Sequence, residues 1–138
     1  DDHRELFSLL NEFRGFCASG EWLDGYHGRL FRFIESLRDR LAIHFALEEA
    51  GSLNDETLIE GNLAHEIESL RKEHIDLYEQ IVQIAHDAEE MRHRRITPRS
   101  LRRLVNRLYQ FDSEFIAHES REAHLLQAAY IDDVGVGD

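Results

Sequence analysis

Residues 97–129 read TPRSLRRLVNRLYQFDSEFIAHESREAHLLQAA and decide the fold class. Thr97 is a suitable helix N-cap, and Pro98 then takes the first helical position, where its missing N–H costs nothing. From there apolar residues recur at alternating steps of three and four, the period of an amphipathic helix facing a core. This stripe comprises Leu101, Leu104, Leu108, Phe111, Phe115, His118, Glu122, Leu125 and Ala129. The stretch therefore predicts one long helix with a polar pair, His118 and Glu122, on its inward face.

Three more runs of the 138-residue chain carry stripes of the same period, and the chain contains only one proline. We expect helices over 2–18, 23–50 and 61–93, the second capped by Asp24 and ended by Gly51, with 51–60 as a looser connection. Their stripes are His3, Leu6, Leu10, Phe13 and Cys17; Leu30, Ile34, Leu37, Leu41, His44 and Glu48; and Leu63, Ile67, Leu70, His74, Leu77, Ile81, Ile84, Ala88 and Met91. Four amphipathic helices with short links predict an all-α, up-down-up-down antiparallel four-helix bundle over 1–130, followed by a flexible tail at 131–138.

Composition excludes several classes of protein. A hydrophobic share of 42% with 32% charged residues is typical of a globular domain. No apolar run approaches the roughly 18 residues of a transmembrane helix, and the chain does not open with a basic-then-apolar signal segment. A net charge of -12 argues against nucleic acid or an anionic membrane as the partner. The lone Cys17 excludes an internal disulfide and a thiolate zinc site, and we expect a buried thiol in a cytoplasmic protein.

Histidine and glutamate interrupt the apolar stripes at matching places. Each predicted helix has one histidine on its inward face, and two helices carry a glutamate one turn later. A buried carboxylate costs several kcal/mol unless it is paired or bound to a metal, and a His-x-x-x-Glu pair suits a metal ion. Counting about 1.5 Å per residue puts the four histidines at nearly one level of the bundle. The candidate metal ligands are His3, His44, Glu48, His74, His118 and Glu122.

The other five histidines lie either off the inward face of their helix or at another level of the bundle. Ideal helix geometry places His65, His86 and His93 about 100–180° around the helix from the inward face. His124 is turned away by roughly 120°, so these four are expected to face solvent. His27 lies on the stripe but about 25 Å along the helix axis from the site. For any single inward histidine a hydrogen-bonded core residue is the alternative, and a structural bundle without metal remains the alternative for the whole set.

The order H…HxxxE…H…HxxxE covers nearly the whole chain and resembles the hemerythrin-like (HHE cation-binding) family. One HxxxE pair is weak support, but two pairs and two lone histidines in phase form a fairly specific signal. The residues that carry the resemblance are His3, His44-Phe-Ala-Leu-Glu48 with Glu49, Glu73-His74, and His118-Glu119-Ser-Arg-Glu122.

The resemblance implies a non-haem di-iron centre with an oxo or hydroxo bridge between two iron ions. Ligand chemistry alone would also admit zinc or manganese, which we expect less. In this assignment one iron is held by His3 and His44, the other by His74 and His118, and the bridging carboxylates are Glu48 and Glu122.

One position departs from the pattern of the oxygen-carrying hemerythrins. They place a second histidine four residues after the one in the third helix, and this chain has Tyr78 there. Fewer histidines leave open positions on iron, so we expect binding of, or reaction with, O2, peroxide or nitric oxide rather than simple oxygen carriage. Oxidase-like, peroxidase-like or nitric-oxide-reactive chemistry is left open, and an iron- or oxygen-sensing regulatory module is the alternative. Tyr78 would donate a hydrogen bond to bound oxygen species or fill space as an aromatic group.

Neighbouring residues allow further interpretations. Glu49 and Glu119 lie about 100° around the helix from ligands, so we expect them to support the site from outside or lie at the surface, with direct ligation as the alternative. Ferritin-like di-iron bundles need two inward Glu-x-x-His units, and only Glu90-x-x-His93, off the stripe, has that spacing.

Seven arginines within 92–107 predict a solvated face far from the metal, or else a docking patch for an acidic protein partner or another subunit.

Overall fold

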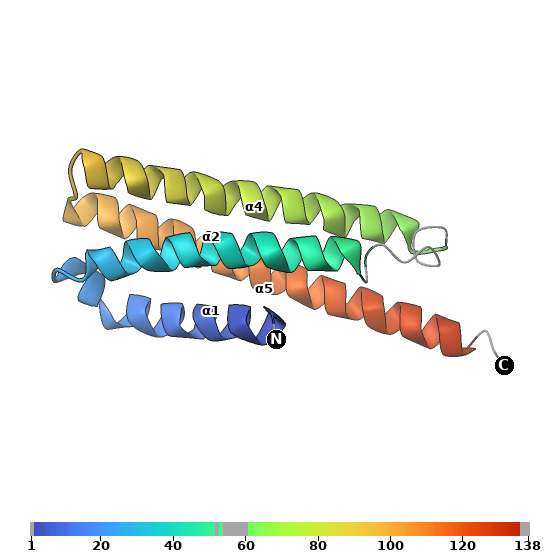
Figure 1. Ribbon diagram of the computed structural model, residues 1–138. Helices are drawn as coiled ribbons and strands as arrows, with labels where there is room; N and C mark the ends of the chain where they lie inside the picture. The colour runs from blue at the N-terminus through green and yellow to red at the C-terminus, as the bar shows by residue number, and fades with distance from the viewer. Residues whose placement is uncertain (1, 52, 54–60, 136–138) are drawn as a thin grey trace.

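The computed structural model describes residues 2–51, 53 and 61–135, with side chains placed through residue 129. Within these ranges the chain is helical and contains no strand. Its elements are α1 (Asp2–Ser19), the short 3-10 helix η1 (Glu21–Leu23), α2 (His27–Ala50), α4 (Ala64–His93) and α5 (Pro98–Gly135). The four long helices lie side by side, and the α1–α2 and α4–α5 links lie at the same end of the molecule (Figure 1). The predicted all-helical fold with four long helices is confirmed.

The start of α5 follows its sequence signals closely. Thr97 Oγ1 accepts a 3.0 Å hydrogen bond from the backbone N–H of Ser100. In return, Ser100 Oγ accepts one of 3.0 Å from the N–H of Thr97. This reciprocal arrangement satisfies two N–H groups that have no partner inside the helix, which is why the helix begins at Pro98.

The start of α2 differs from the expectation. The helix begins at His27, and Tyr26, which makes no side-chain cap, replaces Asp24 at the N-cap. Two glycines nearby explain the shift: Gly20 has φ 74° and Gly25 has φ 103°, left-handed conformations that interrupt a right-handed helix. The other end of α2 is as predicted, because the helix stops at Gly51, whose N–H donates to Leu47 O at 2.9 Å.

The C-terminal helix is longer than the sequence suggested. It continues through residues 131–135, where the sequence predicts a flexible tail. No proline or glycine occurs between Tyr130 and Gly135, so nothing interrupts the helical hydrogen bonds there. Residues 136–138 of that tail, and most of the looser connection predicted at 51–60, lie outside the described residues.

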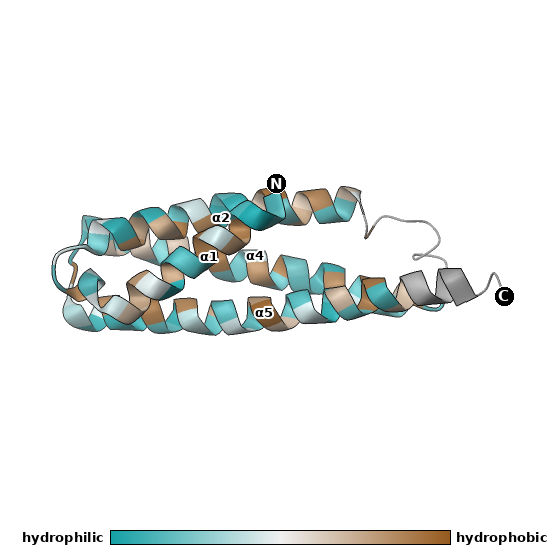
Figure 2. Ribbon diagram, turned by 90° about the horizontal axis from the view of Figure 1, so that it is seen from below, coloured by the Kyte–Doolittle hydropathy of each residue, from teal (hydrophilic) through white to brown (hydrophobic). Residues whose placement is uncertain are grey.

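The core consists of two apolar clusters along the bundle. The larger receives residues from all four long helices, and the smaller contains Leu53, Ile67, Leu70 and Leu125. Most stripe residues are buried as predicted, Cys17 among them. Figure 2 shows hydrophobic and hydrophilic residues alternating along each helix, as amphipathic helices require. The candidate ligands lie between the two clusters, because on α4 and on α5 they fall between a residue of one cluster and a residue of the other.

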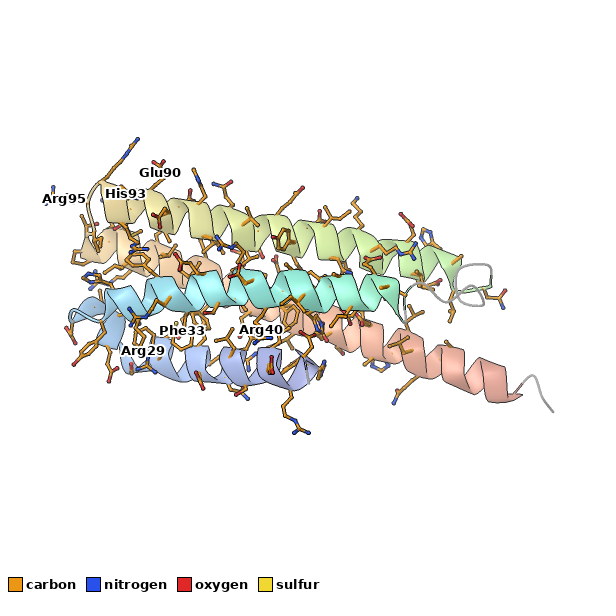
Figure 3. The ribbon with its side chains drawn as sticks, in the orientation of Figure 1. Arg29, Phe33, Arg40, Glu90, His93 and Arg95 are labelled. Atoms are coloured by element: carbon orange, nitrogen blue, oxygen red, sulfur yellow. The ribbon has the colours of Figure 1, made fainter. Side chains whose placement is uncertain are left out.

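The arginine-rich segment surrounds the α4–α5 link. Figure 3 places Arg95 and His93 at that end of the molecule. Arg92 lies 3.6 Å from Glu35 of α2, and Arg107 pairs with Asp87 of α4. These acidic neighbours offset part of the positive charge locally. Among the described helices, none combines the length and the hydropathy required to span a bilayer.

Candidate metal centre

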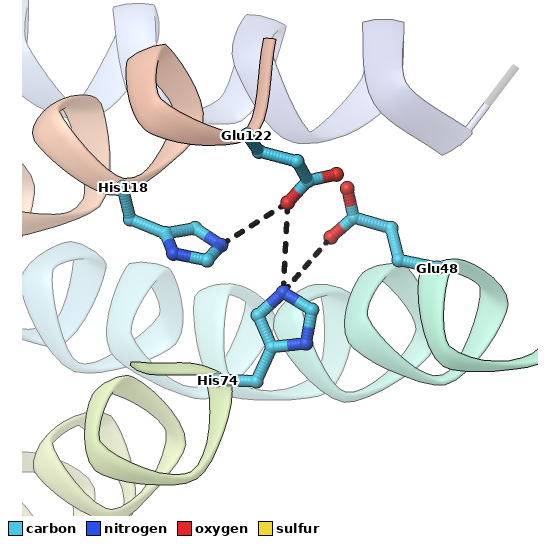
Figure 4. Close-up of side chains that lie close together, drawn as sticks. All are labelled: Glu48, His74, His118 and Glu122. Atoms are coloured by element: carbon cyan, nitrogen blue, oxygen red, sulfur yellow. Dashed lines mark ion pairs between the residues drawn. The ribbon is translucent and has the colours of Figure 1, made fainter. Parts of the chain in front are cut away.

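Four side chains from three helices converge between the apolar clusters (Figure 4): Glu48 of α2, His74 of α4, and His118 and Glu122 of α5. Each offers one ligand atom, and these atoms all lie within 4.8 Å of one another. His118 Nε2 is 3.2 Å from Glu122 Oε2. His74 Nε2 is 3.4 Å from Glu48 Oε1 and 3.6 Å from Glu122 Oε2. The i, i+4 spacing on α5 thus aims an imidazole and a carboxylate at one point.

A second group adjoins the first. His3, His44 and Glu119 also present ligand atoms within 4.8 Å of one another. His44 Nε2 lies 3.2 Å from Glu119 Oε1 and 3.1 Å from Glu48 Oε1. Because the same Glu48 oxygen also faces His74, Glu48 joins the two groups into one continuous cluster.

The structure thus brings all six candidate ligands into the two groups, with one correction to the expected orientation. His3 was expected to face inward, yet it is exposed. It lies in the first turn of α1, where little of the chain covers it, although its ring centroid remains 5.9 Å from that of His44. Glu119, expected mainly outside the site, instead contacts His44 directly. Tyr78 lies at the surface with 37% of its area exposed.

The outward nitrogen of each buried histidine meets a carboxylate from another helix. His44 Nδ1 lies 3.1 Å from Asp2 Oδ2, His74 Nδ1 lies 2.9 Å from Glu49 Oε1, and His118 Nδ1 lies 2.7 Å from Glu73 Oε1. An ionised carboxylate can only accept, so each Nδ1 carries the proton. Where such an imidazole is neutral, the lone pair belongs to Nε2, the nitrogen that faces the cluster. This is the arrangement that orients metal-binding histidines in proteins. His44 Nε2 instead donates to Glu119 Oε1 at 3.2 Å while no metal is bound.

Charge and burial set opposite protonation tendencies within the cluster. Burial alone would lower the pKa of His44, but the hydrogen bond to Glu119 and the close negative charge of Glu119 and Glu48 raise it to about 10. Burial lowers the pKa of His74 despite its bond to Glu49. Burial would raise the pKa of Glu73, yet hydrogen bonds from His118 and Arg121 hold it below its ordinary value. The acidic surroundings thus attract a cation, either a proton at His44 or a metal ion.

Unsatisfied polar atoms are the clearest mark of the site. Imidazole nitrogens lie 3.1–3.6 Å from carboxylate oxygens. Nevertheless, among the described residues four inward atoms are buried without a hydrogen-bond partner: Glu48 Oε1, His74 Nε2, His118 Nε2 and Glu122 Oε2. Each such atom costs about 1–3 kcal/mol. A metal ion would satisfy all four, and a set of imidazole and carboxylate donors fits iron, zinc or manganese.

Asp2, Glu49 and Glu73 form the three outer carboxylates of the site, and the sequence assigned no role to Asp2 or Glu73. Glu73 and His118 are separated by 45 residues and meet only because α4 and α5 lie side by side. Spacing along one helix cannot show such a pair. A partial signal exists, since Asp2 and Glu73 each directly precede a candidate ligand in the sequence.

The remaining histidines lie away from the cluster. His65, His86, His93 and His124 are exposed, as expected. His93 has 76% of its side chain exposed and contacts Glu89 at 2.8 Å, so the Glu-x-x-His unit of the ferritin-like alternative lies on the surface. His27 is half-buried, with its ring against Phe31.

Taken together, the cluster offers four imidazoles and three carboxylates to bind cations. The outer carboxylates fix the rings of His44, His74 and His118 with Nε2 towards the cluster. Comparison of the chain with family models, curated proteins and solved structures found no match. The interpretation of the site therefore depends on its geometry and on the chemistry of its residues.

Proposed function

We propose that this chain is a hemerythrin-like antiparallel four-helix bundle that holds two iron ions in its core and binds or reacts with O2, peroxide or nitric oxide. One observation carries the proposal: four buried ligand atoms without hydrogen-bond partners converge within 4.8 Å, from histidines and glutamates of three helices. A core that binds nothing would retain this cost with no gain. The orientation of every buried imidazole by an outer carboxylate supports the same conclusion.

The contacts suggest how the ligands divide between two positions. We define position A by His74, His118 and Glu122, and position B by His3, His44 and Glu119. Glu48 belongs to both, since its Oε1 faces both His44 and His74. We therefore assign the bridging role to Glu48, whereas Glu122 contacts only the histidines of position A. Glu119 joins the ligand set.

The surrounding residues limit the access of water. The ring of Phe45 stacks on His74 with centroids 4.3 Å apart and meets His118 edge-on at 6.0 Å. Phe115 meets His44 edge-on at 6.1 Å. An iron pair would supply electrons and positive charge to a small bound ligand. The phenylalanines keep the site apolar, and the outer carboxylates hold the protons of the imidazoles at Nδ1.

A second function is favoured by the exposed end of α1. Asp2 and His3, in its first turn, reach the cluster through His44. Metal at position B would therefore tie the start of α1 to α2 and α5. In this alternative the chain is an iron- or oxygen-sensing module whose stability depends on metal occupancy.

Metal analysis with absorption spectroscopy tests the proposal. The protein is loaded with Fe(II) without oxygen, freed of excess metal and then exposed to air. We expect about two iron ions per chain and near-ultraviolet absorption from a bridged ferric pair, and a lower iron content in H118A than in H86A. Well under one iron per chain would refute the proposal, as would tighter binding of zinc or manganese with no such absorption.

Melting temperatures and turnover then separate the two functions. A small difference between metal-free and iron-loaded melting temperatures, with rapid reaction of O2 or peroxide, supports small-molecule chemistry. Unfolding on iron removal without turnover supports the sensor.

A further inference from the structure

Two of the three outer carboxylates are themselves paired with an arginine. The second oxygen of Glu49, Oε2, lies 3.1 Å from Arg71 Nε. Glu73 Oε2 lies 3.0 Å from Arg121 Nε. Two chains of contacts result, one from His74 through Glu49 to Arg71 and the other from His118 through Glu73 to Arg121. Both begin at histidines of position A.

The outer carboxylate of position B has a different environment. Asp2 uses Oδ2 to hold His44. Its other oxygen, Oδ1, is buried and has no hydrogen-bond partner among the described residues. In the part of the chain that the structure describes, no ion pair joins Asp2 to an arginine or lysine. The carboxylates behind position A are therefore neutralised by arginine, whereas the one behind position B is not.

This difference has an electronic consequence. A free carboxylate on Nδ1–H makes an imidazole a stronger electron donor and stabilises the more highly charged state of a bound metal. An arginine on the far side of the carboxylate weakens this electron donation, because it offsets the negative charge of the carboxylate. The positive charge of the arginine also disfavours further positive charge on a metal nearby. Both effects act in the same direction, because both favour the reduced ion at position A.

We propose that Arg71 and Arg121 make the two metal positions electronically unequal, so that the ion at position A is the more easily reduced and the ion at position B the more easily oxidised. The inference depends on the proposed iron pair. Neither arginine contacts a cluster atom, so both are positioning residues that act through Glu49 and Glu73. An unequal pair can hold one Fe(II) and one Fe(III), and so can give or take a single electron.

Arg121 is the better residue to change. Arg71 Nη2 also donates a 2.7 Å hydrogen bond to the carbonyl of Leu53, so its replacement disturbs the segment after α2 as well. The described contacts of Arg121 are with Glu73, and 54% of its side chain is exposed, so R121Q should fold. R107Q is a matched control, because Arg107 also joins α5 to an acid of α4, here Asp87. The 14 residues between the two arginines separate them by about 21 Å along the helix.

The test is a spectroelectrochemical titration of the iron-loaded protein, in which each iron takes one electron from the electrode through a soluble mediator. We expect two steps in the wild type. R121Q should shift the ferric-to-ferrous ratio of the higher-potential step about tenfold towards ferric. This corresponds to a fall of about 59 mV in the reduction potential of that step, since one electron is transferred. R121K keeps the charge and should stay near the wild type, and R107Q should not move either step.

Several results would overturn the inference. In the first, the reduction potentials of R121Q equal those of R107Q, so the arginine has no effect. In the second, R121K shifts the potentials as far as R121Q does, which would mean that geometry and not charge matters. If R121Q holds too little iron, R71Q is titrated instead. A fall in its higher reduction potential would support the inference, and an unchanged potential would contradict it. A wild type that binds no iron contradicts the proposed function itself, whereas one that binds iron with arginine-independent potentials contradicts only this inference.

Discussion

Replacing Glu122 by methionine should stabilise the metal-free protein while impairing metal binding. Glu122 is 4% exposed, and its Oε2 is buried with no hydrogen-bond partner. Such an atom costs about 1–3 kcal/mol, a cost that an apolar side chain of similar length does not carry. His74, whose pKa burial lowers, carries no positive charge at pH 8 to offset the carboxylate. We expect a gain of about 1–3 kcal/mol, or about 3–10 °C in melting temperature for a domain of this size.

Asp112 provides the matched control on the same helix. It is also buried, at 8% exposure, but its two oxygens accept hydrogen bonds of 2.7 and 2.8 Å from Arg14 of α1. D112L removes these bonds and should destabilise the metal-free protein by about 2 kcal/mol, since bonds to charged groups contribute about 1.5–3 kcal/mol each and Arg14 can still reach water. The two carboxylate replacements are therefore expected to have opposite signs.

The assay is thermal unfolding followed by circular dichroism at pH 8 with a chelator present, together with iron analysis after anaerobic loading. E122M should melt higher than the wild type and retain less iron. A lower melting temperature for metal-free E122M would refute the reasoning, because it would mean that the carboxylate is already satisfied in the core. Unchanged iron content in a folded E122M would remove Glu122 from the ligand set.

Three further predictions use other residues. H118A should lose most bound metal in elemental analysis, whereas H27A and H86A should retain it, and equal losses would contradict the separation of inward from outward histidines. The pKa of His44 is raised from 6.5 to about 10, so its stabilising contribution to the metal-free protein is complete below pH 6.5 and lost as pH rises through 10. Melting temperatures should therefore fall over that window, and H44Q should not show this fall. Burial, and to a lesser extent the charge of Asp112, raises the pKa of the Cys17 thiol to about 12. A thiol reagent at pH 8 should therefore react with Cys17 only at the rate of unfolding, and rapid labelling of the folded protein would contradict this.

Much of the fold could be predicted because hydrophobic period and helix-end chemistry are local signals. The Thr97 cap and the Gly51 stop were both confirmed. The start of α2 was not predicted correctly, because glycine permits a left-handed conformation without requiring it, so the positive φ angles of Gly20 and Gly25 could not be read from the sequence. The extra turn of α5 was missed because an absence of periodicity does not stop a helix.

The candidate site could be predicted only along each helix. The angle around the helix and the distance along its axis identified His44, His74 and His118, since both quantities depend on position within one helix. They could not show that Glu119 reaches His44 across the bundle at 3.2 Å. Such contacts depend on the rotation of neighbouring helices and on side-chain rotamers. The exposure of His3 likewise depends on where other helices pass the start of α1.

The placement of the polar cluster between two apolar clusters has a consequence for local unfolding. The larger cluster joins all four long helices, whereas among the described residues the smaller comprises Leu53, Ile67, Leu70 and Leu125, with Leu63 packed against it. Regions with few buried apolar contacts open at lower free energy than the rest of a domain. The end beyond the cluster can therefore open while the remainder stays folded, exposing ligands of α4 and α5 to solvent. Amide protons in that end should exchange faster in the metal-free protein, and metal would enter and leave by this partial opening rather than by global unfolding.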